Sequence, residues 1–143
     1  MFVRILCVLL AALVPAAYCN ADLGEEEMQI AITITVGDTS FPATLFDVPA
    51  ARELQQQLPL TINMQELNGN EKYHYFDTSF SAESERVGSI ASGDLMLYGS
   101  DCLVLFYDSF STPYSYTRLG AVDDPTGLAE ALGRGNVEVT FAQ

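Results

Sequence analysis

The run PYSYTR places an arginine beside two aromatic residues at alternating positions. In an extended strand, Tyr114 and Tyr116 next to Arg118 can form a shelf that holds a peptide. Arg118 is the first candidate for a site residue, because the other arginines fall on a predicted helix, in a polar loop or after a second helix. The structural alternative is an ion pair between Arg118 and an acid such as Asp101 or Asp123.

A second aromatic pair, Tyr73 and Tyr75, flanks the sole histidine, His74, on a predicted strand. Side chains alternate across a strand, so the histidine lies on the face opposite to the tyrosines. We expect both tyrosines to point inward, which leaves His74 facing water as a bystander. The alternative is that the histidine takes part in pH-sensitive binding. The ligand-binding candidates are therefore Tyr73, Tyr75, Tyr114, Tyr116 and Arg118, with filling of the fold's walls as the alternative for the tyrosines.

Other site chemistry has little support in the residues. Cys102 opens an apolar run without a base nearby in sequence, so we expect an inert, buried thiol. The serines lack a G-x-S-x-G setting, and no glycine-rich loop is suited to phosphate. One histidine and one cysteine in the folded domain cannot build a zinc centre, and the acidic clusters at 25–27 and 123–124 lack the spacing of a calcium loop. We expect no metal and no cofactor.

The N-terminus has the pattern of a secretory signal peptide. Arg4 precedes an uncharged apolar run at 5–17, and small and polar residues follow. This run is shorter than the roughly 20 residues that a transmembrane helix needs. We predict a signal peptide at 1–21, an acidic leader at 22–27 and one domain at 28–143.

Signal cleavage between Cys19 and Ala21 would also decide the cysteine chemistry. It removes Cys7 and can remove Cys19, which leaves Cys102 and no intrachain disulfide. Lipoprotein anchoring through Cys19 is disfavoured, because Tyr18 precedes it where a small residue is expected. We expect a periplasmic or secreted protein that is not inserted in a membrane.

The acidic composition limits the partners. The sequence holds 19 acidic and 6 basic residues, for a formal net charge of −13, and loss of Arg4 with the signal peptide lowers it by one to −14. Nucleic acids and anionic lipid surfaces are disfavoured. Solubility of an exported monomer explains the charge, and an acidic patch that recruits a basic partner is the alternative.

Periodicity and turn residues predict a β-rich domain. Eight strands are expected, at 28–36, 39–46, 59–67, 71–76, 95–98, 102–107, 111–122 and 136–143. The run at 102–107 is apolar throughout and is expected to be buried on both faces. Since closure removes exposed sheet edges, these strands favour a closed or nearly closed antiparallel barrel, with the last strand pairing near the first.

Two short helices and one long loop complete the prediction. The first helix follows Asp47 as a candidate N-cap, and the second is capped by Asp124, Pro125 and Gly133. The polar stretch at 77–92 has no period and is expected to be a surface loop with one turn of helix.

Three segments carry a resemblance to a known family: MQIAITITVGDTSFPATLFD, LPLTINMQELNGNEKYHYF and, above all, SGDLMLYGSDCLVLFYDSFSTPYSYTRLGAVDDPTGLAEALG. From about Met28 to Gln143, the chain closely resembles the bacterial cyclophilin-like domain family, whose members are largely uncharacterised. The resemblance implies a closed eight-stranded cyclophilin-like antiparallel β-barrel with two short capping helices. The segments that cyclophilins use for proline isomerisation have no counterpart here, so no functional residue carries over.

Three functions follow as hypotheses. The first is a non-catalytic module that binds a peptide or small molecule between the strand at 72–76 and the strand at 114–119. The second is a divergent peptidyl-prolyl cis-trans isomerase in which Arg118 weakens the amide resonance of a bound proline. The third is an acidic partner subunit of a protein complex.

Overall fold

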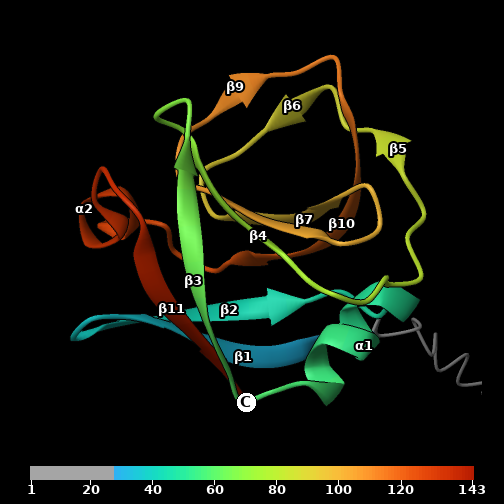
Figure 1. The fold of residues 1–143 in the computed structure, drawn as a ribbon, viewed down its shortest axis with the longest axis horizontal. Coiled ribbons are helices and arrows are strands. Elements are labelled where there is room, and N and C mark those ends of the chain that lie inside the picture. The colour runs from blue at the N-terminus through green and yellow to red at the C-terminus, as the bar shows by residue number, and fades with distance from the viewer. Residues whose placement is uncertain (1–27) are drawn as a thin grey trace, which may run out of the picture.

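Eight antiparallel strands close into a barrel in the computed structural model, which describes residues 28–143 (Figure 1). Around the barrel the neighbours are, in order, β2 (Thr39–Leu45), β1 (Ile30–Val36), β11 (Val137–Ala142), β3 (Leu60–Leu67), β4 (Glu71–Tyr75), β8 (Cys102–Phe106), β7 (Asp94–Tyr98) and β10 (Ser115–Val122). The last of these, β10, pairs again with β2. The predicted signal peptide at 1–21 and acidic leader at 22–27 lie outside the described residues.

The remaining elements are the helices α1 (Pro49–Gln56) and α2 (Leu128–Leu132) and the short strands β5 (Glu85–Arg86), β6 (Ser89–Ile90) and β9 (Phe110–Ser111).

Local sequence signals account for the first hairpin and its neighbours. Alternating apolar residues form β1, and Gly37 takes a positive φ of 58° in the turn to β2. The last strand, β11, pairs with β1 from Thr33 opposite Ala142 to Thr35 opposite Thr140, as the sequence predicts.

The barrel closes where β10 meets β2. Three residue pairs make this contact, from Gly120 opposite Leu45 to Val122 opposite Ala43. A Cβ atom on Gly120 would lie 2.1 Å from the backbone oxygen of Thr44, so only glycine permits the approach. Closure therefore depends on a position without a side chain.

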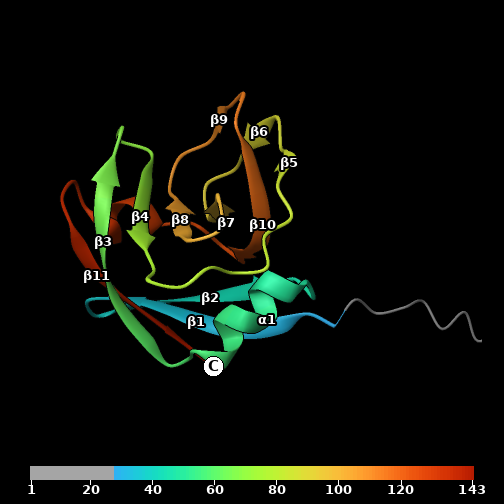
Figure 2. The ribbon, with the colours of Figure 1, turned by 45° about the vertical axis from the view of Figure 1, so that its right-hand side comes forward.

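Two apolar clusters lie on opposite sides of the barrel wall. The larger fills the interior and includes Leu103 and Leu105 of β8. The smaller lies outside and includes Cys102, Val104 and Phe106 of the same strand. Every residue of β8 is therefore buried, as the apolar run at 102–107 predicts. Figure 2 shows β5, β6 and β9 gathered on the side of the barrel formed by β7, β8 and β10.

The two helices lie on opposite sides of the barrel (Figure 1). Ala50, Ala51 and Leu54 of α1 and Leu128 and Leu132 of α2 all join the interior cluster. No helix in the described part of the chain is long and apolar enough to cross a membrane.

The predicted N-caps of both helices were wrong, whereas Gly133 is the C-cap of α2, as the sequence predicts. Val48 is the N-cap of α1, while the Asp47 carboxylate accepts a hydrogen bond from Arg52. Gly127 is the N-cap of α2, and Asp124 instead accepts bonds from the backbone and hydroxyl of Thr126. In both places the carboxylate accepts a hydrogen bond from another nearby donor instead of capping the helix. Sequence spacing alone does not reveal which of these donors the carboxylate binds.

The stretch at 77–92 contains no turn of helix, contrary to expectation. It contributes β5, which pairs with β10 through Arg86 opposite Ser115, and β6, which pairs with β9 through Ile90 opposite Phe110. These two-residue ladders depend on partners distant in sequence, so local periodicity carries no sign of them.

Candidate functional site

A groove of about 330 Å³ runs across the outer face of β4, β8, β7 and β10. Five of the six tyrosines in the described residues line it. Tyr73 and Tyr75 come from β4, Tyr98 ends β7, Tyr114 precedes β10, and Tyr116 lies within that strand. The structure thus brings together the four tyrosines predicted as ligand contacts and adds a fifth.

Two pairs of tyrosine rings stand nearly perpendicular to each other. The centroids of Tyr73 and Tyr75 are 5.8 Å apart at 78°, and those of Tyr98 and Tyr114 are 6.3 Å apart at 80°. Tyr75, Tyr98 and Tyr114 are exposed, at 58%, 47% and 58% of their surface, while Tyr116 is buried beneath them. The groove therefore offers ring faces and ring edges to solvent at the same place.

The expectation that Tyr73 and Tyr75 point inward was wrong. Tyr73 packs against the outer cluster, whereas Phe76 packs against the barrel interior. His74 consequently lies on the inner face of β4, where its Nδ1 is 2.9 Å from the backbone oxygen of Asn63 and its ring meets the Phe76 ring edge-on at 5.0 Å. The sequence pattern gives the alternation but not which face is inside.

The two predicted binding strands are not neighbours. Between β4 and β10 lie β8 and β7, in that order. The groove spans this distance because large side chains rise from the strands at its borders, while Cys102 and Val104 of β8 lie along its floor.

Cys102 is a buried thiol that lines the groove. Burial raises its pKa to about 11. The thiol is therefore protonated at neutral pH, which agrees with the expectation of an unreactive cysteine.

Glu71 is the one charged residue among the described residues that line the groove. It is only 9% exposed, and within residues 28–143 its carboxylate forms no ion pair and accepts no side-chain hydrogen bond. Burial and the nearby charge of Glu66 raise its pKa. Sequence reasoning missed Glu71 and Tyr98, although the period of two from Tyr73 and Tyr75 back to Glu71 places all three on one face.

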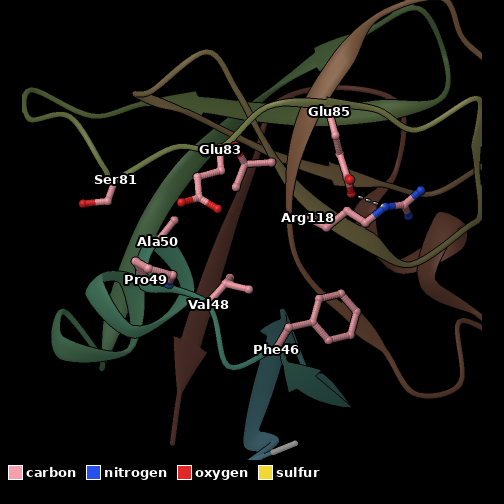
Figure 3. Close-up of a pocket in the computed structure, with 9 residues that line it drawn as sticks. Phe46, Val48, Pro49, Ala50, Ser81, Glu83, Glu85 and Arg118 are labelled. Carbon is pink, nitrogen blue, oxygen red and sulfur yellow. Dashed lines mark hydrogen bonds and ion pairs between the residues drawn. The ribbon is translucent and has the colours of Figure 1, made fainter.

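Arg118 lies apart from the tyrosine groove. It lines a separate hollow of about 430 Å³ formed in part by Phe46, Val48 and Pro49. Figure 3 shows its guanidinium directed toward Glu85 and away from Pro49. Its Nε is 3.3 Å from the Glu85 carboxylate, and this ion pair replaces the predicted one with Asp101 or Asp123.

A second contact holds Arg118 in that position, because its guanidinium donates a hydrogen bond of 3.4 Å to the backbone oxygen of Val87. Asp123 instead accepts a hydrogen bond of 2.7 Å from the Thr44 hydroxyl. Arg118 thus belongs to the segment around β5, and the structure does not join it to the four tyrosines predicted with it.

No group of three or more histidine, cysteine, aspartate or glutamate side chains is arranged to hold a metal ion in the part of the chain that the structure describes. The chemistry offered by the groove is that of aromatic rings, one thiol and one carboxylate.

Comparison with known proteins agrees with the architecture. No curated protein and no solved structure matches the chain. A family model described as "Cyclophilin-like family" matches residues 34–142, from β1 to the end of β11. The matched residues include seven complete strands of the closed barrel, the last part of β1 and both helices, and the chain therefore belongs to the cyclophilin-like family.

Proposed function

We propose that this protein is an exported, non-catalytic binding module that holds a peptide or small molecule in the tyrosine groove. The observation that carries the proposal is the convergence of five tyrosines on one hollow, three of them about half exposed. Clustered aromatic rings on a surface favour association, and tyrosine is enriched where proteins bind ligands.

The size and chemistry of the groove support binding rather than catalysis. Its 330 Å³ falls in the range typical of ligand pockets, at the lower end. Its one thiol has a pKa of about 11, and Arg118 lies in the other hollow. A proline bound among the tyrosines would therefore meet no arginine to weaken its amide resonance.

Nuclear magnetic resonance titration with a peptide and fragment library tests the proposal. We expect bound molecules to shift the resonances of groove residues, and Tyr75→Ala or Tyr114→Ala to weaken binding by about tenfold. Arg118→Ala is the matched control, because it removes a half-exposed side chain outside the groove and should leave affinity unchanged.

The isomerase alternative is tested with a model peptide that contains one Xaa-Pro bond. Under our proposal, the protein does not accelerate isomerisation above the uncatalysed rate. Activity that disappears in Arg118→Ala while the fold survives would overturn the proposal in favour of the enzyme.

Export is the second part of the proposal and rests on the pattern at 1–21. Mass spectrometry of the chain recovered from its producing cells should find a mature N-terminus at Asn20 or Asp22. Retention of residues 1–21, or an acyl chain on Cys19, would contradict a soluble exported protein.

A further inference from the structure

We propose that the tyrosine groove selects ligands that carry an organic cation, an alkylammonium or guanidinium group, and that the Glu71 carboxylate is its counter-ion. The inference deepens the proposed function and rests on it. It assigns a chemical class to the ligand and a role to the Glu71 carboxylate, which forms no ion pair within residues 28–143.

The position of Glu71 is the first argument. It begins β4 opposite Phe106 of β8, on the same face as Tyr73 and Tyr75, and is only 9% exposed. Holding a carboxylate in a largely buried position without an ion pair is unfavourable, because the charge loses much of its hydration and gains no opposite charge in return. A cation that enters the groove would provide the missing partner.

Residues 28–143 supply no cation of their own at this point. The titratable groups that interact with Glu71 are Glu66 of β3, Cys102 of β8, Tyr107 after β8 and Tyr116 of β10, and none is basic. The adjacent lysine points to the other face of β4.

That lysine, Lys72, already donates hydrogen bonds to three acceptors. Its Nζ lies 2.6 Å from the Glu66 carboxylate and donates further bonds to the backbone oxygens of Gly133 and Gly135, at 2.8 and 2.7 Å. It is also completely buried, so it cannot turn to neutralise Glu71.

The tyrosine rings are the second argument. The face of an aromatic ring attracts a cation within about 6 Å of its centroid, and several rings around one site form a cage for quaternary ammonium groups. Here the Tyr98 ring has Tyr114 at 6.3 Å and Tyr116 at 5.8 Å, with interplanar angles of 80° and 54°. Rings tilted in this way form the walls of a corner rather than a flat stack.

Charge across the whole molecule acts in the same direction. The formal net charge of −13 attracts cations from a distance and raises their local concentration. Glu71 adds selectivity at short range, because in the part of the chain that the structure describes it is the one charged residue that lines the groove. The volume of 330 Å³ exceeds that of one ammonium or guanidinium group, so part of the attached ligand can also enter.

Two pairs of probes that differ in charge but not in shape test the inference by isothermal titration calorimetry. Choline is compared with 3,3-dimethylbutan-1-ol, and an acetylated pentapeptide with one arginine is compared with the same peptide containing citrulline. We expect the cation of at least one pair to bind about fivefold or more tightly than its neutral counterpart. Preference in the choline pair alone identifies a small organic cation as the ligand, and preference in the peptide pair identifies a basic peptide.

Two variants locate the effect. Glu71→Gln keeps the shape of the side chain and should reduce the preference for the cation to less than about twofold. Glu138→Gln removes an exposed carboxylate that does not line the groove and should leave the preference intact. Nuclear magnetic resonance spectra of both variants check that the fold persists.

Equal binding of cation and neutral probe would overturn the inference and leave the groove's binding function standing. If neither member of either pair binds, the inference is also overturned. The titration with the peptide and fragment library then tests the proposed binding function separately. A preference that survives Glu71→Gln would show that the carboxylate is not the counter-ion and would likewise contradict the inference.

Discussion

The fold disfavours the charged form of the Glu71 carboxylate. Its pKa is raised in the folded protein by burial and by Glu66, so the folded state binds a proton more tightly than the unfolded state. The group therefore lowers the free energy of unfolding as the pH rises above the ordinary range for glutamate. Below that range both states are protonated, and the effect disappears.

We predict that Glu71→Gln stabilises the protein at pH 7, by a few tenths to about 1 kcal/mol. Urea denaturation at pH 7 and at pH 4 measures the difference, which should shrink at the lower pH. Glu138→Gln, an exposed change on β11, serves as the control. Destabilisation by Glu71→Gln at pH 7 would mean that the carboxylate has a partner essential to the fold.

Cys102 gives a second prediction at the residue scale. With its pKa at about 11, the thiolate fraction at pH 8 is roughly 100-fold below that of a free cysteine. A more basic thiolate is also more nucleophilic, so we expect alkylation of Cys102 by iodoacetamide in the folded protein to be slower by about tenfold or more. Mass spectrometry of the peptide that contains Cys102 follows the reaction, and the same protein in concentrated urea is the control. Rapid labelling of the folded protein would contradict a buried, protonated thiol.

Among the elements, β4 does most to connect the site with the rest of the barrel. Its outer face carries Glu71, Tyr73 and Tyr75 to the groove, and its inner face carries Lys72 to the loop after α2. Lys72 and Glu66 form an ion pair with side chains 0% and 21% exposed. The strand is thus held at its inner face while its outer face is free for a ligand.

We predict that Lys72→Met destabilises the protein by about 2–4 kcal/mol, because it removes the ion pair with the Glu66 carboxylate and the donor to the backbone oxygens of Gly133 and Gly135. Urea denaturation measures the loss, and hydrogen exchange should increase in the loop at 133–136. Arg134→Met, an exposed change in that loop, is the control and should stay within about 0.5 kcal/mol. Equal effects of the two variants would contradict the role given to Lys72.

Lowering the pH should remove the stabilisation that the ion pair of Lys72 and Glu66 provides. Burial alone would raise the pKa of Glu66, but the hydrogen bonds from Lys72 and Tyr107 outweigh it and lower the pKa. The stabilisation by this pair is therefore present above the ordinary pKa of glutamate and is lost as the pH falls through the lowered value. This sign is opposite to that of Glu71, five residues along the chain.

On the scale of the molecule, closure of the barrel depends on one short contact. Gly120 of β10 lies against Thr44 and Leu45 of β2, and an added Cβ would be 2.1 Å from a backbone oxygen and 2.9 Å from the Leu45 Cα. Backbone atoms cannot move aside as a side chain can. The two strands would have to separate, which opens the interior core to water.

We predict that Gly120→Ala lowers the free energy of unfolding by about 3 kcal/mol or more, or prevents folding. Gly135→Ala is the matched control, since a Cβ there meets nothing within 4 Å. Thermal unfolding followed by circular dichroism compares the two variants. Similar midpoints for both would show that β10 and β2 tolerate wider spacing and that closure is not the constraint.

The sequence alone predicted the elements and the fold class well, because period-two alternation, continuous apolar runs and turn glycines are local signals. It placed the strands within a few residues of their observed bounds, identified β8 as buried on both faces and indicated that the last strand pairs near the first. It also selected four of the five groove tyrosines, because aromatic residues at alternating positions already mark a shared strand face.

Only the tertiary structure decided what those residues meet. Alternation divides β4 into two faces but does not say which one is inside, so Tyr73 and Tyr75 were assigned to the wrong face. In the sheet, β8 and β7 lie between the two strands that carry the predicted tyrosine pairs. The two-residue pairing of β5 with β10 places Glu85 beside Arg118, and the two form an ion pair. The buried, unpaired state of Glu71 depends on the same long-range packing, since isolation of a charge is a property of its surroundings in space and not of its neighbours in the chain.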